Sequence, residues 1–154
     1  MRFWISCALV VAFPVHAQVK IENAWARATA PGSKIAAGYM TIRNAAAAPD
    51  RLLGTTTPAA EKVETHVTVK DGEIFRMREV KGYDIPAGGS FELRPGGAHL
   101  MFVNIKVPFK EGDKVPVTLK FEKAGEIKVD FHVGRLGETA KRARDAPATR
   151  TQPQ

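Results

Sequence analysis

The sequence predicts an all-β fold, an antiparallel Greek-key β-sandwich or barrel. Short apolar or β-branched runs recur from Val19 to Val133, Gly, Pro, Asp and Asn separate them, and no long stretch has the 3.6-residue period of a helix. The length of 154 residues suits one domain. The 44% hydrophobic and 25% charged residues exclude a disordered chain and a polytopic membrane protein.

The expected strands are short, and turn signals such as Pro-Gly, Asp-Gly or Gly-Gly separate most of them. They span Val19–Arg27, Ala36–Asn44, Arg51–Thr57, Lys62–Lys70, Glu73–Val80, Ser90–Leu93, His99–Ile105, Val115–Glu122 and Glu126–Val133. Many short strands at this spacing favour an antiparallel sandwich or barrel.

The chain divides into three predicted parts. Residues 1–17 show the pattern of a cleaved signal peptide, with Arg2, an apolar stretch too short to span a bilayer, and a cleavage motif ending at Ala17. Residues 18–137 form the β-sandwich domain, and residues 138–154 are expected to be a disordered basic tail. We therefore expect a periplasmic protein with no stable membrane insertion after cleavage.

Charge and cysteine usage narrow the function further. The formal net charge is +7, but Lys and Arg alternate with Glu and Asp and no row of aromatic residues accompanies them, so we expect no nucleic-acid partner. The single cysteine, Cys7, lies in the predicted signal peptide. The mature domain would then have no thiol, and this rules out thiolate metal sites, a cysteine nucleophile and a blue-copper centre.

The first candidate pair of metal ligands lies on a predicted hairpin. Asp71 and Gly72 stand between two alternating runs and predict a two-residue loop. That loop would place His66 directly opposite Met77, with Cβ atoms about 5 Å apart.

The second candidate pair is His99 and Met101, which share a face because they are two residues apart in a predicted strand. A set of imidazole and thioether ligands is soft and neutral, which favours Cu(I) over Mg²⁺, Ca²⁺ or Zn²⁺. The residues alone do not establish that the two pairs converge. A sandwich in which these side chains merely pack remains the alternative.

Other candidate residues are expected to have ordinary roles. Met40 and Trp25 are expected in the core, and His132 has no soft neighbour in the sequence. Several acidic residues could form acid–base pairs but lack a nucleophile or pocket beside them, so a solvated surface is expected for Glu61, Glu64, Asp71, Glu79 and Asp113.

The spacing of His66, Met77, His99 and Met101 resembles the signature of the PCuAC-type periplasmic copper chaperones, which supply copper to the CuA centre of cytochrome c oxidase. The resemblance extends over about Val19 to Val133 and includes the stretches 23–27, 37–40, 93–101 and 120–125. It implies a cupredoxin-like β-sandwich in which these four residues bind Cu(I). The His- and Met-rich extension of some relatives is absent from the tail, so no second site is expected there.

The expected function is therefore that of a non-enzymatic periplasmic Cu(I) chaperone. Its partners would be the copper ion and an acceptor cuproprotein, either the CuA subunit of cytochrome c oxidase or another copper chaperone. The alternatives are a copper-tolerance or storage protein, an exported copper enzyme or electron carrier, and a structural or adhesive sandwich without metal. Stabilisation by Cu(I) would exclude the last of these.

Overall fold

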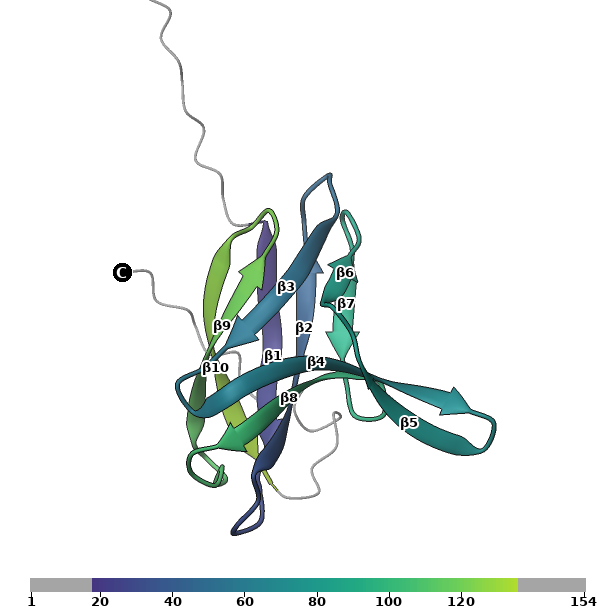
Figure 1. The fold of residues 1–154 in the computed structure, drawn as a ribbon. Helices are drawn as coiled ribbons and strands as arrows, with labels where there is room; N and C mark the ends of the chain where they lie inside the picture. Colours follow the sequence, from purple (N-terminus) through teal and green to yellow (C-terminus); the bar gives the residue numbers. More distant parts are fainter. Residues whose placement is uncertain (1–17, 136–154) are drawn as a thin grey trace, which may run out of the picture.

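The computed structural model describes residues 18–135 and contains ten strands and no helix in that part of the chain (Figure 1). Accordingly, no helix there is long and apolar enough to cross a membrane. The strands are β1 (Val19–Arg27), β2 (Ile35–Asn44), β3 (Asp50–Thr56), β4 (Ala60–Asp71), β5 (Ile74–Glu79), β6 (Tyr83–Ile85), β7 (Ser90–Leu93), β8 (Ala98–Ile105), β9 (Lys114–Phe121) and β10 (Glu126–Gly134). The predicted all-β class is confirmed. The predicted signal peptide (1–17) and tail (138–154) lie outside the described residues.

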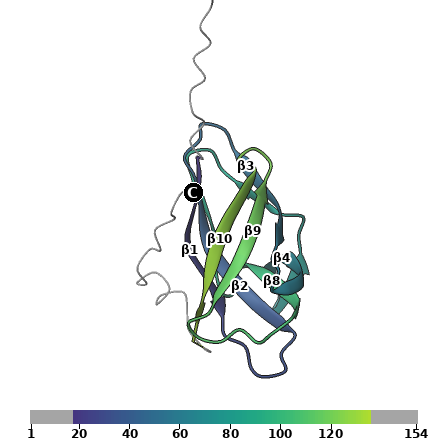
Figure 2. The ribbon, with the colours of Figure 1, turned by 90° about the vertical axis from the view of Figure 1, so that its left-hand side faces the viewer.

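All ten strands belong to one sheet in the order β5-β4-β8-β2-β1-β10-β9-β3-β6, and β7 pairs with β2. The sheet is mixed rather than purely antiparallel, because β1 and β10 run parallel. The sheet curls around a common core: β4 and β8 run across β1 and β2 at a steep angle (Figure 1), and β9 and β10 lie on another side of the body (Figure 2).

The core takes alternate residues from the strands that surround it. The fully buried ring of Phe102 makes edge-on contacts with the rings of Phe109 and Phe131. Met40 is buried among the core residues, as predicted. A Cβ atom on Gly38 would lie 2.7 Å from Cε2 of Phe102. Glycine is therefore what allows this ring to lie against β2.

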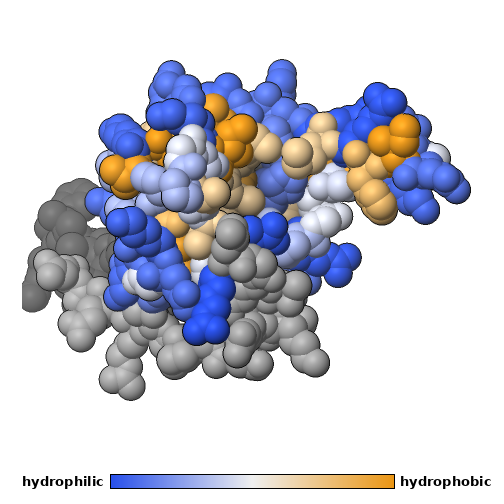
Figure 3. Space-filling model, turned by 90° about the horizontal axis from the view of Figure 1, so that it is seen from below, coloured by the Kyte–Doolittle hydropathy of each residue, from blue (hydrophilic) through white to orange (hydrophobic). Residues whose placement is uncertain are grey.

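An arm formed by the ends of β4 and β5 projects from the body (Figure 1). Every residue of β5 is exposed, and within the described residues β5 pairs with β4 alone. The large apolar side chains Ile74, Phe75 and Met77 are 59%, 68% and 60% exposed. Figure 3 shows apolar surface at the end of the arm, between hydrophilic groups.

The register of this hairpin differs from the prediction. Asp71 pairs with Ile74, so the two loop residues are Gly72 and Glu73, and Gly72 has φ 63°. The physical reason is that the first loop position requires a positive φ, which glycine adopts at no steric cost and aspartate does not. The predicted direct pairing of His66 with Met77 is therefore wrong.

Candidate metal centre

The two predicted imidazoles meet in the structure. His66 of β4 and His99 of β8 are direct partners across the two antiparallel strands. Their ring centroids are 5.7 Å apart with an interplanar angle of 68°. Both side chains are largely enclosed, since His99 is 6% exposed and the side chain of His66 is 12% exposed. Strand pairing thus supplies a convergence that sequence spacing alone could not establish.

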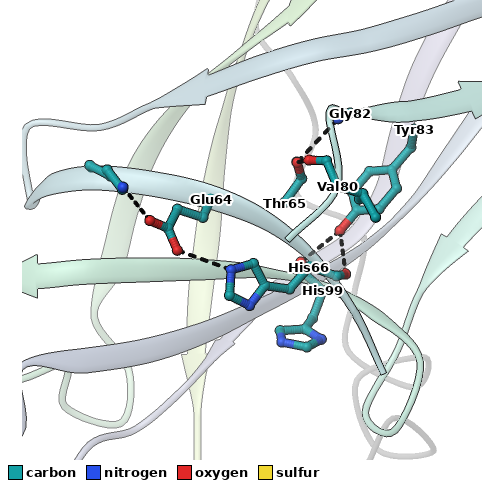
Figure 4. A network of polar contacts seen from close by, with 8 residues as sticks. Glu64, Thr65, His66, Val80, Gly82, Tyr83 and His99 are labelled. Carbon is teal, nitrogen blue, oxygen red and sulfur yellow. Dashed lines mark hydrogen bonds and ion pairs between the residues drawn. The ribbon is translucent and has the colours of Figure 1, made fainter. Parts of the chain in front are cut away.

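One nitrogen of each ring is already engaged, and Figure 4 shows the contact between His66 and Glu64. Nε2 of His66 lies 3.0 Å from Oε2 of Glu64, and Nδ1 of His99 lies 3.0 Å from the carbonyl oxygen of Gly97. Both acceptors require a proton on the nitrogen that faces them, so the lone pair of each neutral ring is on its other nitrogen. Nδ1 of His66 is buried and has no hydrogen-bond partner within the described part of the chain. A buried lone pair without a donor suits a metal ion.

The backbone beneath the histidine pair is fixed by one hydroxyl group. The Oη atom of Tyr83 in β6 lies 2.7 Å from the carbonyl oxygens of both His66 and His99 and shares its proton between them. Burial of the phenol raises the pKa of Tyr83 to about 12. Tyr83 therefore remains a donor at every physiological pH.

The two predicted thioether ligands flank the histidine pair. Met101 follows His99 by two residues on the same face of β8, and its partner in β4 is Glu64. Met77 of β5 pairs with Thr68. It therefore lies on the face of His66 as a diagonal neighbour, and the two residues are roughly 7–8 Å apart in such a pair. The shift of register preserves the face because it moves the pairing by two positions.

A second set of donors on this face was not predicted. Glu64, expected as solvated surface, has a side chain only 15% exposed and pairs with both Lys62 and His66. The hydrogen bond from Lys62, aided by that from His66, outweighs burial and lowers the pKa of the Glu64 carboxyl. Glu79 of β5 is the strand partner of His66 of β4. A spacing of two residues between Glu64 and His66 in one strand was the signal available in the sequence.

The remaining candidates lie outside the centre. The ring of Trp25 is buried and its centroid lies 4.7 Å from that of Tyr39, which agrees with the predicted packing role. His132 of β10 pairs with Trp25 of β1, and two strands separate β10 from β8 in the sheet.

Comparison with known families finds one family model that matches, described as "Putative lipoprotein LpqE-like", over residues 19–133. A curated relative named "Putative lipoprotein Lxx21020", from Leifsonia xyli subsp. xyli, is 36% identical over 104 residues, which is 67% of this chain and 61% of the relative. The chain thus spans about three-fifths of the length of the curated relatives it matches.

Solved structures include similar domains. The copper-bound PCuAC domain from PmoF2 matches with a TM-score of 0.68 and 31% identity, over 77% of this chain and 93% of that domain. The solution structure of CuI-DR1885 from Deinococcus radiodurans matches with a TM-score of 0.61 and 31% identity, over 82% of this chain and 83% of that one. The predicted cupredoxin-like fold and the resemblance to PCuAC-type proteins are confirmed. That family is of a copper-chaperone type rather than an enzyme type.

Proposed function

The chain belongs to the LpqE-like family of PCuAC-type domains, and from that premise we propose that it is an exported copper chaperone. In this proposal the domain binds one Cu(I) ion through His66, Met77, His99 and Met101. It then transfers the ion to an acceptor cuproprotein, the CuA centre of cytochrome c oxidase. No covalent chemistry or turnover is involved.

One observation carries the proposal, the histidine pair itself. Nε2 of His66 and Nδ1 of His99 each face a hydrogen-bond acceptor, so the lone pairs on Nδ1 of His66 and Nε2 of His99 are left for an ion. Hydrogen bonds of this kind fix the tautomer and orientation of metal-binding histidines in proteins. Tyr83 holds the two strands together directly beneath the rings.

The thioethers decide which ion the site prefers. Met77 and Met101 occupy opposite diagonals around the histidine pair. Neutral sulfur donors stabilise Cu(I) and bind hard divalent ions poorly. Cu(I) is therefore the oxidation state that we propose for the cargo.

Transfer follows from the unequal exposure of the ligands. Met77 is 60% exposed, whereas His99 is 6% exposed. A donor atom of an acceptor protein can displace the exposed thioether first, while the histidines still hold the ion. The ion then passes between proteins without being released into water.

The cellular setting is also part of the proposal. The Leifsonia relative is named a lipoprotein, and lipoproteins are exported, which supports export of this chain. The periplasm is the compartment that we propose, in agreement with the signal pattern of residues 1–17.

An anaerobic Cu(I) titration against a chromophoric chelator tests the ligand set. We expect one equivalent to bind, and Met77→Leu and Met101→Leu each to weaken the affinity by at least about tenfold. Met40→Leu is the matched control, because Met40 is buried in the core, and its Cu(I) affinity should match the wild type. Equal affinity of all three variants would refute the proposed ligands.

The proposed acceptor needs a cellular test. Deletion of the gene under copper limitation should remove the CuA signal of cytochrome c oxidase, and the wild-type gene should restore it. A gene carrying Met77→Leu and Met101→Leu together should fail to restore it. Loss of copper tolerance with an intact CuA centre would instead assign the protein to copper detoxification.

A further inference from the structure

We propose that the Glu64 and Glu79 carboxylates and the His66 imidazole form a second cation site, which takes a divalent ion such as Zn(II) or Cu(II) and excludes Cu(I) binding while it is occupied. This site goes beyond the proposed function. The divalent site itself stands apart from the proposed function, whereas its exclusion of Cu(I) rests on that function, because both sites use His66.

The donors of this site are brought together by two strands. One ring nitrogen of His66 and one carboxylate oxygen from each of Glu64 and Glu79 all lie within 4.8 Å of one another. Glu64 precedes His66 by two residues on β4, and Glu79 is the partner of His66 on β5. The arrangement therefore follows from strand geometry and does not require a loop to close.

The chemistry of the donors differs from that of the proposed Cu(I) ligands. One nitrogen and two carboxylate oxygens are the ligands that Zn(II) and Cu(II) accept, and their two negative charges balance a divalent ion. Lys62 now pairs with Glu64, but the Lys62 side chain is 58% exposed. It can turn into solvent when a cation takes its place.

Competition between the two ions follows from the single lone pair of a neutral imidazole. In the structure, Glu64 faces Nε2 of His66, so the lone pair is on the buried Nδ1 atom. A divalent ion bound by the carboxylates and Nε2 would take the place of the proton on Nε2. The neutral ring then carries its proton on Nδ1. Nδ1 is no longer available to Cu(I) in that state.

Zn(II) is the appropriate probe, because it has no redox chemistry and titrates without a reductant. We expect one equivalent to bind to the apo protein. Glu79→Gln should weaken Zn(II) binding by at least about tenfold and change Cu(I) affinity by less than about threefold, since only one exposed charge is lost. Met77→Leu should show the reverse pattern. His66→Gln should lose Zn(II) binding.

Glu73→Gln is the matched control, since it removes the same charge from an exposed position of the same hairpin. Equal loss of Zn(II) affinity in Glu73→Gln and Glu79→Gln would overturn the proposed site, and so would an equal loss in Met77→Leu. Zn(II) retained in His66→Gln would also overturn it. Zn(II) binding that depends on Glu79 in a protein that fails to bind Cu(I) would support this site and refute the proposed function.

Discussion

Removing the hydroxyl of Tyr83 should loosen the histidine pair without creating a cavity in the core. Tyr83 is 3% exposed, and its ring stacks on Phe91 with a centroid separation of 4.9 Å. Tyr83→Phe keeps that packing and deletes only the donor that the carbonyl groups of His66 and His99 share. Any change in stability or Cu(I) affinity then reports on this hydrogen bond.

The expected magnitude at neutral pH follows from removing a hydrogen-bond donor that two carbonyl groups share. Such a loss costs about 1–3 kcal/mol of unfolding free energy. The proposed ligands are displaced at the same time, so Cu(I) affinity should fall about tenfold, as it does when supporting groups around a metal site are removed.

The pH dependence supplies a second and sharper expectation. The pKa of Tyr83 is raised to about 12 in the folded protein, from an ordinary value of 10.0. The contribution of its hydroxyl to the free energy of unfolding is therefore complete below pH 10 and is lost as pH rises towards 12. Two pKa units correspond to about 2.7 kcal/mol. The stability curves of wild type and Tyr83→Phe should therefore converge between pH 10 and 12.

Urea unfolding at pH 7, 9.5 and 11.5 measures both effects. The difference between the two proteins should be constant at the two lower pH values and small at the highest. A Tyr83→Phe variant as stable as wild type at pH 7, or a difference that persists undiminished to pH 12, would refute this account of Tyr83.

Three further substitutions test other parts of the fold. Burial opposes ionisation of Asp50, but three backbone N–H groups outweigh it and lower its pKa. Asp50→Asn should therefore cost about 2 kcal/mol at pH 7, and urea titrations should show this difference fading as pH falls below 3.8. Gly82→Ala should cost more than about 2 kcal/mol by thermal unfolding, since φ is +83° and a Cβ would lie 2.0 Å from the Leu52 carbonyl oxygen. Phe75→Ser should change the same measurement by less than about 0.5 kcal/mol, because Phe75 is 68% exposed; a larger loss would place its ring in a packed cluster.

The strands with a strong alternating pattern could be predicted from the sequence. The Ser90–Leu93 strand has the predicted bounds, because turns rich in Gly and Pro limit it on both sides. The short strand Tyr83–Ile85 could not be predicted. Its three residues offer too little periodicity, and its position depends on pairing with β3, which is distant in the sequence.

The candidate centre was predictable only in part. Spacing placed His99 and Met101 on one face, which local strand geometry determines. The meeting of His66 with His99 depends on which strands become neighbours, and the whole sheet decides that. Glu64 was assigned to the surface because no nucleophile or pocket stands beside it in the sequence. Its spacing of two residues from both Lys62 and His66 in a predicted strand was the signal that these three side chains share a face.

The position of β5 at the end of the sheet also bears on aggregation. Its outer backbone groups have no strand partner within the described residues, and such an edge can pair with the same edge of a second copy. Arg76 and Arg78 alternate with Phe75 and Met77 along this strand. Like charges from two copies would meet if the edges approached each other. The arginines thus let the strand present an exposed thioether while opposing the self-association that an apolar edge would promote.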